Sequence, residues 1–109
     1  MNTIELKGAM KVPIKNYSKT GNVCRVTFKL PADINAGKIF LCGDFNKWDP
    51  SSNPMNKRKD GSWSTTISLK AGKSYQFRYL IDGKDWENDW DADKYIPNSF
   101  GTEDSVIKV

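Results

Sequence analysis

One stretch constrains the fold of this chain more than any other. Residues 75–81 (Tyr-Gln-Phe-Arg-Tyr-Leu-Ile) place large apolar or aromatic side chains at every second position. This period of two predicts a β-strand with one buried face, and it puts Arg78 and Leu80 on the opposite face. Residues 82–83 (Asp-Gly) predict a tight turn, because glycine adopts the positive φ angles that such turns need. Since Trp86 follows at once, we expect the fold to pack on one face of this strand and the function to use the other.

Several other segments have a strand-like pattern. Residues 23–30 and 62–69 also alternate, residues 39–42 are entirely apolar, and residues 106–109 close the chain as a last strand. No segment has a convincing helical period, and short turns rich in Gly, Pro and Asp separate the runs. About six strands arranged in this way predict an all-β antiparallel sandwich. The predicted core consists of side chains of matching parity: Phe28, Leu41, Trp63, Ile67, Phe77, Tyr79 and Ile81.

The length bounds the number of domains. A chain of 109 residues suffices for one domain with one modest core. Pro13 interrupts any helix in residues 1–20, so we expect a loosely ordered arm or an edge strand there and the sandwich in residues 21–109. The chain has no apolar run near the ~20 residues that span a membrane. The N-terminus also lacks the pattern of a signal peptide, and we expect a cytoplasmic protein that does not bind membranes.

The two cysteines and the absence of histidine narrow the chemistry. Cys24 and Cys42 lie in predicted strands, and in a cytoplasmic protein we expect two buried, unpaired thiols. The sequence has no Cys-x-x-Cys pair, which together with the missing histidine argues against zinc sites and against His-dependent nucleophiles. Gly-rich phosphate-binding motifs are also absent. We therefore expect neither a cofactor nor a metal.

The charge is distributed unevenly. Residues 1–84 carry 15 basic and 6 acidic side chains, whereas residues 85–109 carry 2 basic and 7 acidic ones. A basic body can bind nucleic acid, but the lysines are scattered and only residues 57–59 (Lys-Arg-Lys) form a cluster. A solvated surface is the better interpretation. Binding of single-stranded nucleic acid stays a third hypothesis, and we expect no nucleic-acid partner.

The acidic segment 85–93 does not predict catalysis. Its alternating Asp residues resemble the start of a calcium-binding EF-hand, but Lys94 stands where that loop needs Gly and Phe100 where it needs Glu. A pair of carboxylates can hydrolyse glycosidic bonds, yet so short a chain has little room for a water-excluding cleft. We expect a solvated loop and no enzymatic activity.

Two tryptophans predict a binding surface. Trp48 and Trp86 each follow a strand end and lie among polar residues. The apolar face of a sugar ring packs flat on an indole, which combines burial of apolar surface with attraction to the π face. The alternative is that both rings cap the ends of the sandwich core. Side chains suited to bind sugar hydroxyls at the rim are Asn46, Lys47, Arg78 and Asn98.

Three stretches, in order, carry a resemblance to a known family. They are residues 40–48 (Phe-Leu-Cys-Gly-Asp-Phe-Asn-Lys-Trp), 71–83 (Ala-Gly-Lys-Ser-Tyr-Gln-Phe-Arg-Tyr-Leu-Ile-Asp-Gly) and 97–109 (Pro-Asn-Ser-Phe-Gly-Thr-Glu-Asp-Ser-Val-Ile-Lys-Val). Over residues 23–109 the chain resembles family 48 carbohydrate-binding modules. These are the early-set, immunoglobulin-like domains at the N-termini of isoamylases and glycogen-branching enzymes. The glycogen-binding domain of the AMP-activated protein kinase β subunit belongs to the same family.

The resemblance also implies a site. Trp48, Trp86 and Arg78 match the glucan-contacting tryptophans and basic residue of the kinase-type members, and Lys47 adjoins the first tryptophan. Three positions depart from the family. Phe100 replaces a leucine, Asp104 replaces an asparagine and Trp90 stands where proline is usual. Residues 84–85 also lengthen the turn before Trp86 by one residue, which can re-aim that ring, and Asp104 cannot donate hydrogen bonds as an amide does.

The implied function is non-catalytic binding of an α-1,4-glucan such as glycogen, starch or a maltooligosaccharide. The catalytic barrel that accompanies the module in enzymes is not within these 109 residues, so we expect a stand-alone targeting or regulatory module. A glycogen-metabolising enzyme is a candidate protein partner. The alternative is a protein–protein interaction domain of the same fold with a degenerate sugar site.

Overall fold

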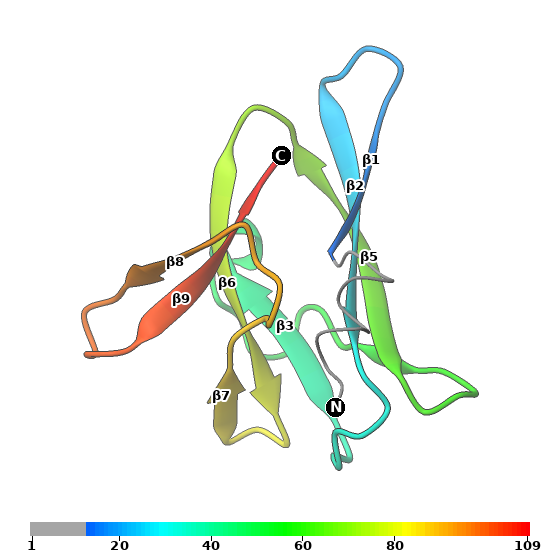
Figure 1. Ribbon diagram of the computed structural model, residues 1–109, viewed down its shortest axis with the longest axis vertical. Helices are drawn as coiled ribbons and strands as arrows, with labels where there is room; N and C mark the ends of the chain where they lie inside the picture. Colours follow the sequence, from blue (N-terminus) through cyan, green and yellow to red (C-terminus); the bar gives the residue numbers. More distant parts are fainter. Residues whose placement is uncertain (1–12) are drawn as a thin grey trace.

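The computed structural model describes residues 13–109 as two layers of antiparallel strands (Figure 1). Sheet A has the order β1-β2-β5-β4, and sheet B has the order β3-β6-β9-β8 with β7 added beside β6. The strands are β1 (Ile14–Tyr17), β2 (Val23–Leu30), β3 (Ile39–Gly43), β4 (Asn56–Lys57), β5 (Trp63–Lys70), β6 (Ser74–Ile81), β7 (Asp85–Glu87), β8 (Lys94–Pro97) and β9 (Glu103–Lys108). The one helical element in residues 13–109 is a single 3₁₀ turn, η1 (Asp44–Asn46). The predicted all-β sandwich is confirmed.

The core lies between the two sheets, as the alternating patterns predict. Five of the seven predicted core residues are buried, and Ile67 and Ile81 are half-buried against the core cluster. The ring of Phe28 in sheet A meets Phe77 in sheet B edge to face, with centroids 5.1 Å apart. Such aromatic pairs contribute about 0.5–1.5 kcal/mol beyond the burial of their surface. Sheet packing is therefore anchored by rings from both layers.

Strand β6 is central to sheet B and differs from the prediction on one face. It pairs with β3, β9 and β7. Leu80 was predicted on the exposed side with Arg78, but it is buried there without joining the core cluster. The residue opposite Leu80 in the register is Trp86 of β7, a strand within a segment that the sequence predicted to be irregular. The outer face of sheet B is consequently a second packed surface.

The prediction of a solvated loop for the acidic segment 85–93 is wrong in part, because residues 85–87 form β7. Asp89 is only 3% exposed and accepts a 2.6 Å hydrogen bond from the hydroxyl of the buried Tyr79. Its backbone N–H donates to Ser105 Oγ, which lies on β9. A buried phenol needs a polar partner, and this acidic segment supplies one. Burial raises the pKa of the Asp89 carboxyl, while the Tyr79 bond opposes that rise.

Both cysteines are free and buried, as predicted. Burial, followed by the nearby Asp49 carboxylate, raises the pKa of the Cys42 thiol to about 11, so this thiol stays protonated near neutral pH. In the predicted N-terminal arm, β1 pairs with β2 at the edge of sheet A, and residues 1–12 lie outside the described part. None of the described helices is long and apolar enough to span a membrane.

Candidate functional site

Trp48, Arg78 and Trp86 come together on the outer face of sheet B. The rings of Trp48 and Trp86 meet edge to face, with centroids 6.3 Å apart and planes inclined by 61°. The guanidinium carbon of Arg78 lies over the Trp86 ring, 5.7 Å from its centroid. Trp86 keeps 41% of its surface exposed. The arrangement is a two-ring platform with a cation beside it.

The register of β7 explains where Trp86 lies. The three-residue turn 82–84 joins β6 to β7 and pairs Ile81 with Asp85, which sets Trp86 opposite Leu80. Side chains paired across strands share a face, and alternate residues on one strand do also. Trp86 therefore lies on the same face as Arg78, and the lengthened turn leaves it there.

Asp82 holds this turn in place. Its Oδ1 accepts hydrogen bonds from the backbone N–H groups of Gly37 (2.8 Å) and Lys38 (3.0 Å). These bonds, that of Lys38 first, lower the pKa of the Asp82 carboxyl. Its own φ of 53° lies in the left-handed region, which Asp tolerates better than most residues. The turn that aims Trp86 is thus fastened to the loop before β3.

Trp48 lies on a tightly built loop after β3. Asn46 fastens that loop, since its side chain accepts from Gly43 N–H and donates to Leu41 O and Asn53 Oδ1. Lys47 and Trp48 both have φ of 58°, a left-handed conformation that costs about 1–3 kcal/mol in a residue other than glycine. A bulky residue held at positive φ is uncommon, and such strain persists only where the surroundings enforce it.

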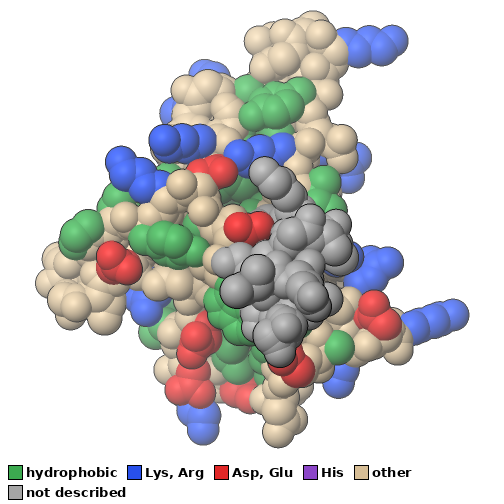
Figure 2. Space-filling model, viewed as in Figure 1, with side chains coloured by type: hydrophobic (Ala, Val, Ile, Leu, Met, Phe, Trp, Pro, Cys, Tyr) green, Lys and Arg blue, Asp and Glu red, His purple; other side chains and the backbone are tan. Residues whose placement is uncertain are grey.

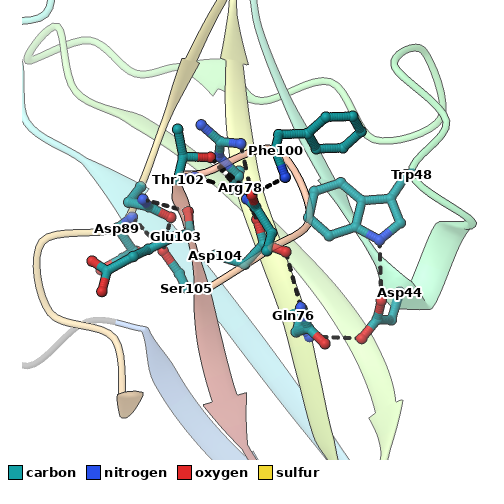
Figure 3. A network of polar contacts seen from close by, with 12 residues as sticks. Asp44, Trp48, Gln76, Arg78, Asp89, Phe100, Thr102, Glu103, Asp104 and Ser105 are labelled. Carbon is teal, nitrogen blue, oxygen red and sulfur yellow. Dashed lines mark hydrogen bonds and ion pairs between the residues drawn. The ribbon is translucent and has the colours of Figure 1, made fainter. Parts of the chain in front are cut away.

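Asp44 fixes the orientation of the Trp48 ring. Trp48 Nε1–H donates to Asp44 Oδ1 at 3.0 Å, and the backbone N–H of Gln76 donates to Asp44 Oδ2 at 2.8 Å (Figure 3). The indole N–H is therefore already used inside the protein, and the ring offers a ligand its carbon surface. Asp44 was not among the predicted site residues. The sequence does contain one indication of its role: Asp44 precedes Trp48 by four residues, so a short loop keeps the carboxylate near the indole.

Asp104 lies at the centre of a polar network on the same face (Figure 3). Asp104 is buried, with only 7% of its surface exposed. Its carboxylate accepts hydrogen bonds from Gln76 Nε2 at 2.9 Å and Asn98 Nδ2 at 3.0 Å. Arg78 Nη1 lies 3.9 Å from its Oδ1. Both carboxylate oxygens thus face groups of the protein.

The remaining predicted residues lie around this centre. Phe100 is 86% exposed on the turn after β8, and Lys47 is exposed beside Trp48. Asn98 shapes the Phe100 turn because its Oδ1 accepts from the backbone N–H groups of Phe100 and Thr102. The amides of Asn46 and Asn98, which the sequence suggested as sugar-binding groups, are thus engaged within the protein.

The profile of carbohydrate-binding module 48 (isoamylase N-terminal domain) matches residues 15–96. The chain belongs to the carbohydrate-binding module 48 family. The resemblance inferred from the three sequence stretches is therefore confirmed, and the match spans most of both sheets.

Relatives include 1,4-α-glucan branching enzymes. That of Aquifex aeolicus is 36% identical over 94 residues, covering 80% of this chain and 14% of the enzyme. That of Lactobacillus acidophilus is 46% identical over 52 residues, covering 47% of this chain and 8% of the enzyme. The chain thus spans a small part of these enzymes, the part that corresponds to the carbohydrate-binding module, and their catalytic domain lies outside it.

A solved structure shows the same fold. The enterochelin esterase of Shigella flexneri superimposes with a TM-score of 0.69 over 96% of this chain and 34% of the esterase. The sequence identity of 11% limits this likeness to the fold. The two-sheet sandwich is therefore an architecture that also occurs outside the branching enzymes.

Proposed function

We propose that this domain binds α-1,4-glucans without catalysis, through sugar rings stacked on Trp48 and Trp86. The observation that carries the proposal is the inclined pair of rings, 6.3 Å apart at 61°, in a chain of this family. Successive glucose units of an α-1,4-linked chain curve, so two inclined surfaces suit them better than one flat surface. Such a glucan is neutral and presents both C–H faces and hydroxyl groups.

Pre-organisation supports the proposal. Trp48 is held by Asp44 and Trp86 by the strand register, so neither ring has to be ordered when a ligand arrives, and less entropy is lost on binding. Each ring contributes about 1–2 kcal/mol from buried area and ring geometry together. Affinity for short sugars is therefore weak, and longer chains that reach both rings bind more tightly.

Arg78 supplies donors beside the platform. Its guanidinium lies over the Trp86 ring, and the 41% of Trp86 that stays exposed is available to a sugar. The N–H groups that Asp104 does not engage can donate to glucose hydroxyls between the two rings. Basic side chains are otherwise spread over the surface, as Figure 2 shows for one face, which favours a neutral ligand over a polyanion.

Electrophoresis in a native gel containing glycogen tests the proposal. The Trp48→Ala and Trp86→Ala variants should each lose retardation, which corresponds to at least about tenfold weaker binding. Their circular dichroism spectra and melting points should stay near those of the wild type. Trp90→Ala is the matched control, because Trp90 is 53% exposed and lies outside the ring pair, so it should be retarded like the wild type.

Other outcomes select the alternatives. If either variant unfolds, that ring belongs to the core. If the wild type is not retarded, the protein–protein interaction domain becomes the better hypothesis, with the exposed Phe100 and Trp86 as its contact surface. Binding that weakens steeply with salt indicates nucleic acid, whereas stacking on a neutral glucan changes little. The mass of the natural protein decides whether these residues act as a stand-alone targeting or regulatory module.

A further inference from the structure

We propose that Asp104 is a positioning residue of the glucan site, which holds Arg78 and the Phe100 turn in place without contacting the sugar. This inference rests on the proposed glucan-binding function. It assigns Asp104 a role different from that implied by the family resemblance, in which an asparagine at this position contacts glucan. The difference follows from how the carboxylate is enclosed.

Both oxygens of Asp104 are engaged inside the protein. Oδ2 accepts from Gln76 Nε2, and Oδ1 accepts from Asn98 Nδ2. The side chain keeps only 9% of its surface exposed, so a sugar hydroxyl could reach it only by displacing one of these partners. A buried acceptor that already has its donors does not need a ligand.

The negative charge has a specific counterpart in Arg78. Arg78 Nη1 lies 3.9 Å from Asp104 Oδ1, and this is the one ion pair of Arg78 in the part of the chain that the structure describes. Arg78 Nε is buried and has no hydrogen-bond partner among residues 13–109. A half-buried guanidinium with so few partners depends on a nearby opposite charge to stay in one place. Asp104 provides that charge.

The same carboxylate also fastens the Phe100 turn. Asn98 uses its Oδ1 for the backbone N–H groups of Phe100 and Thr102, so its amide cannot be reversed without breaking the turn. Its Nδ2 must therefore face an acceptor, and Asp104 Oδ1 is that acceptor. One oxygen atom thus faces donors from both the strand that carries Arg78 and the turn that carries Phe100.

Asp104→Asn separates the charge from the hydrogen bonds. Its amide oxygen can still face Asn98, and its NH₂ group can donate to a reversed Gln76 amide, because Gln76 uses only its Nε2 in the network. The variant therefore keeps the hydrogen bonds and loses the charge. If Asp104 positions Arg78, the variant should weaken binding of maltoheptaose. If residue 104 contacts the sugar directly, the family-like amide should preserve or strengthen binding.

Titration calorimetry with maltoheptaose measures the effect. Asp104→Asn should weaken binding about 3- to 10-fold, and the control Glu103→Gln, which removes the same charge from the adjacent exposed residue, should bind like the wild type. In an Arg78→Ala background, Asp104→Asn should cause little further loss, because the two residues act together. Equal losses in both backgrounds, or unchanged affinity in Asp104→Asn alone, would overturn the proposal.

A second measurement needs no sugar. In the wild type, the Nε–H proton of Arg78 should give a distinct NMR signal with slow solvent exchange, because the atom is buried. In Asp104→Asn that signal should broaden or exchange faster, while Glu103→Gln leaves it unchanged. An unaltered signal in a folded Asp104→Asn variant contradicts positioning even if the wild type binds no glucan. Failure of the proposed function and failure of this inference therefore give different results.

Discussion

The outer faces of the two sheets differ although both sheets contribute to the same core. On sheet A the outward residues of β2 and β5 are short or charged and mainly exposed, and Thr27 Oγ1 meets Thr66 Oγ1 at 2.9 Å. On sheet B the outward face contains buried side chains outside the core cluster, including Cys42, Leu80 and Val106. The outer face of sheet A is therefore mainly solvated, whereas the outer face of sheet B is packed against further side chains.

This difference explains why the candidate site lies on sheet B. Side chains on a solvated sheet face have few neighbours to fix their conformation. On sheet B, the Trp48 loop, β7 and the Phe100 turn are tied to the outward face through Asp44, the β6–β7 register and Asp104. Side chains restrained in this way lose little freedom on binding. Sites are therefore expected where a sheet packs on both faces.

The largest expected effect comes from Gly43→Ala, which breaks the junction between β3 and the Trp48 loop. A Cβ atom at Gly43 would lie 2.6 Å from the backbone oxygen of Gln76 and 2.8 Å from the ring of Phe45. Backbone cannot yield to such overlap cheaply, and overpacking of this kind costs roughly 3 kcal/mol. Thermal unfolding should show a melting point lower by at least about 10 °C, with loss of glycogen retardation.

Gly37→Ala is the matched control for this variant. A Cβ atom at Gly37 would meet only the side-chain atom Asp82 Oδ1, at 3.4 Å, and no backbone atom. The melting point of this variant should therefore change by a few degrees at most. If both glycine variants are equally stable, the steric constraint at Gly43 is absent and sheet B tolerates a looser junction than the structure shows.

The sequence predicted the parts of the molecule that depend on local alternation. The core positions of β2, β5 and β6 follow from a period of two, and so does the outward direction of Arg78. Leu80 and Asp89 were misassigned because their burial depends on contacts with other elements. Leu80 lies opposite Trp86 across the β6–β7 pair, and Asp89 accepts a hydrogen bond from Tyr79 of β6. An apolar residue at an outward position reveals a second packed layer only after the strand opposite it is known.

The main residues of the candidate site could be predicted from the sequence, but the residues that hold them in place could not. Trp48, Trp86 and Arg78 follow from the family resemblance and from parity, and the structure places them together. Asp44 and the enclosed state of Asp104 could not be derived, because hydrogen bonds between separate loops depend on tertiary distances. The contacts that restrain the candidate site are therefore visible only in the structure.

Tyr79→Phe should have the next largest effect, and it tests the core face of sheet B. The variant leaves the buried Asp89 carboxylate without the 2.6 Å bond from Tyr79 Oη, which should cost about 2 kcal/mol near pH 7. The Tyr79 bond lowers the pKa of Asp89 against the upward effect of burial. A bond that favours the ionised carboxyl contributes stability above the pKa of that group, and this contribution is lost as the pH falls through it.

Urea unfolding at several pH values measures this dependence. The difference between wild type and Tyr79→Phe should be largest near pH 7 and should shrink as the pH falls through the pKa of Asp89, which burial holds above its ordinary value. Tyr75→Phe is the control on the same strand, because Tyr75 Oη donates to the neutral backbone oxygen of Lys70. Its cost, about 1 kcal/mol, should not vary with pH. A pH-independent cost for Tyr79→Phe would show that Asp89 is already protonated at neutral pH.

The smallest effect should come from Lys15→Gln, which removes an ion pair that joins the two sheets at their edge. Lys15 of β1 donates to Asp93 Oδ2 at 2.8 Å, and the backbone N–H of Lys108 donates to the same oxygen at 2.7 Å. Burial alone would raise the pKa of Asp93, but these hydrogen bonds outweigh it and hold the pKa below its usual value. The pair therefore contributes stability near neutral pH that is lost as the pH falls through that lowered pKa.

Because Lys15 and Asp93 are both partly exposed, water weakens their attraction, and the expected loss in Lys15→Gln is about 0.5 kcal/mol at low salt. Roughly 1 M salt shortens the screening length to about 3 Å, so the loss should then disappear. Urea unfolding at both salt concentrations measures it, with the exposed Lys19→Gln as the charge-matched control. A loss that persists in high salt would mean that the Lys15 stem, and not its charge, holds the edge of sheet A against sheet B.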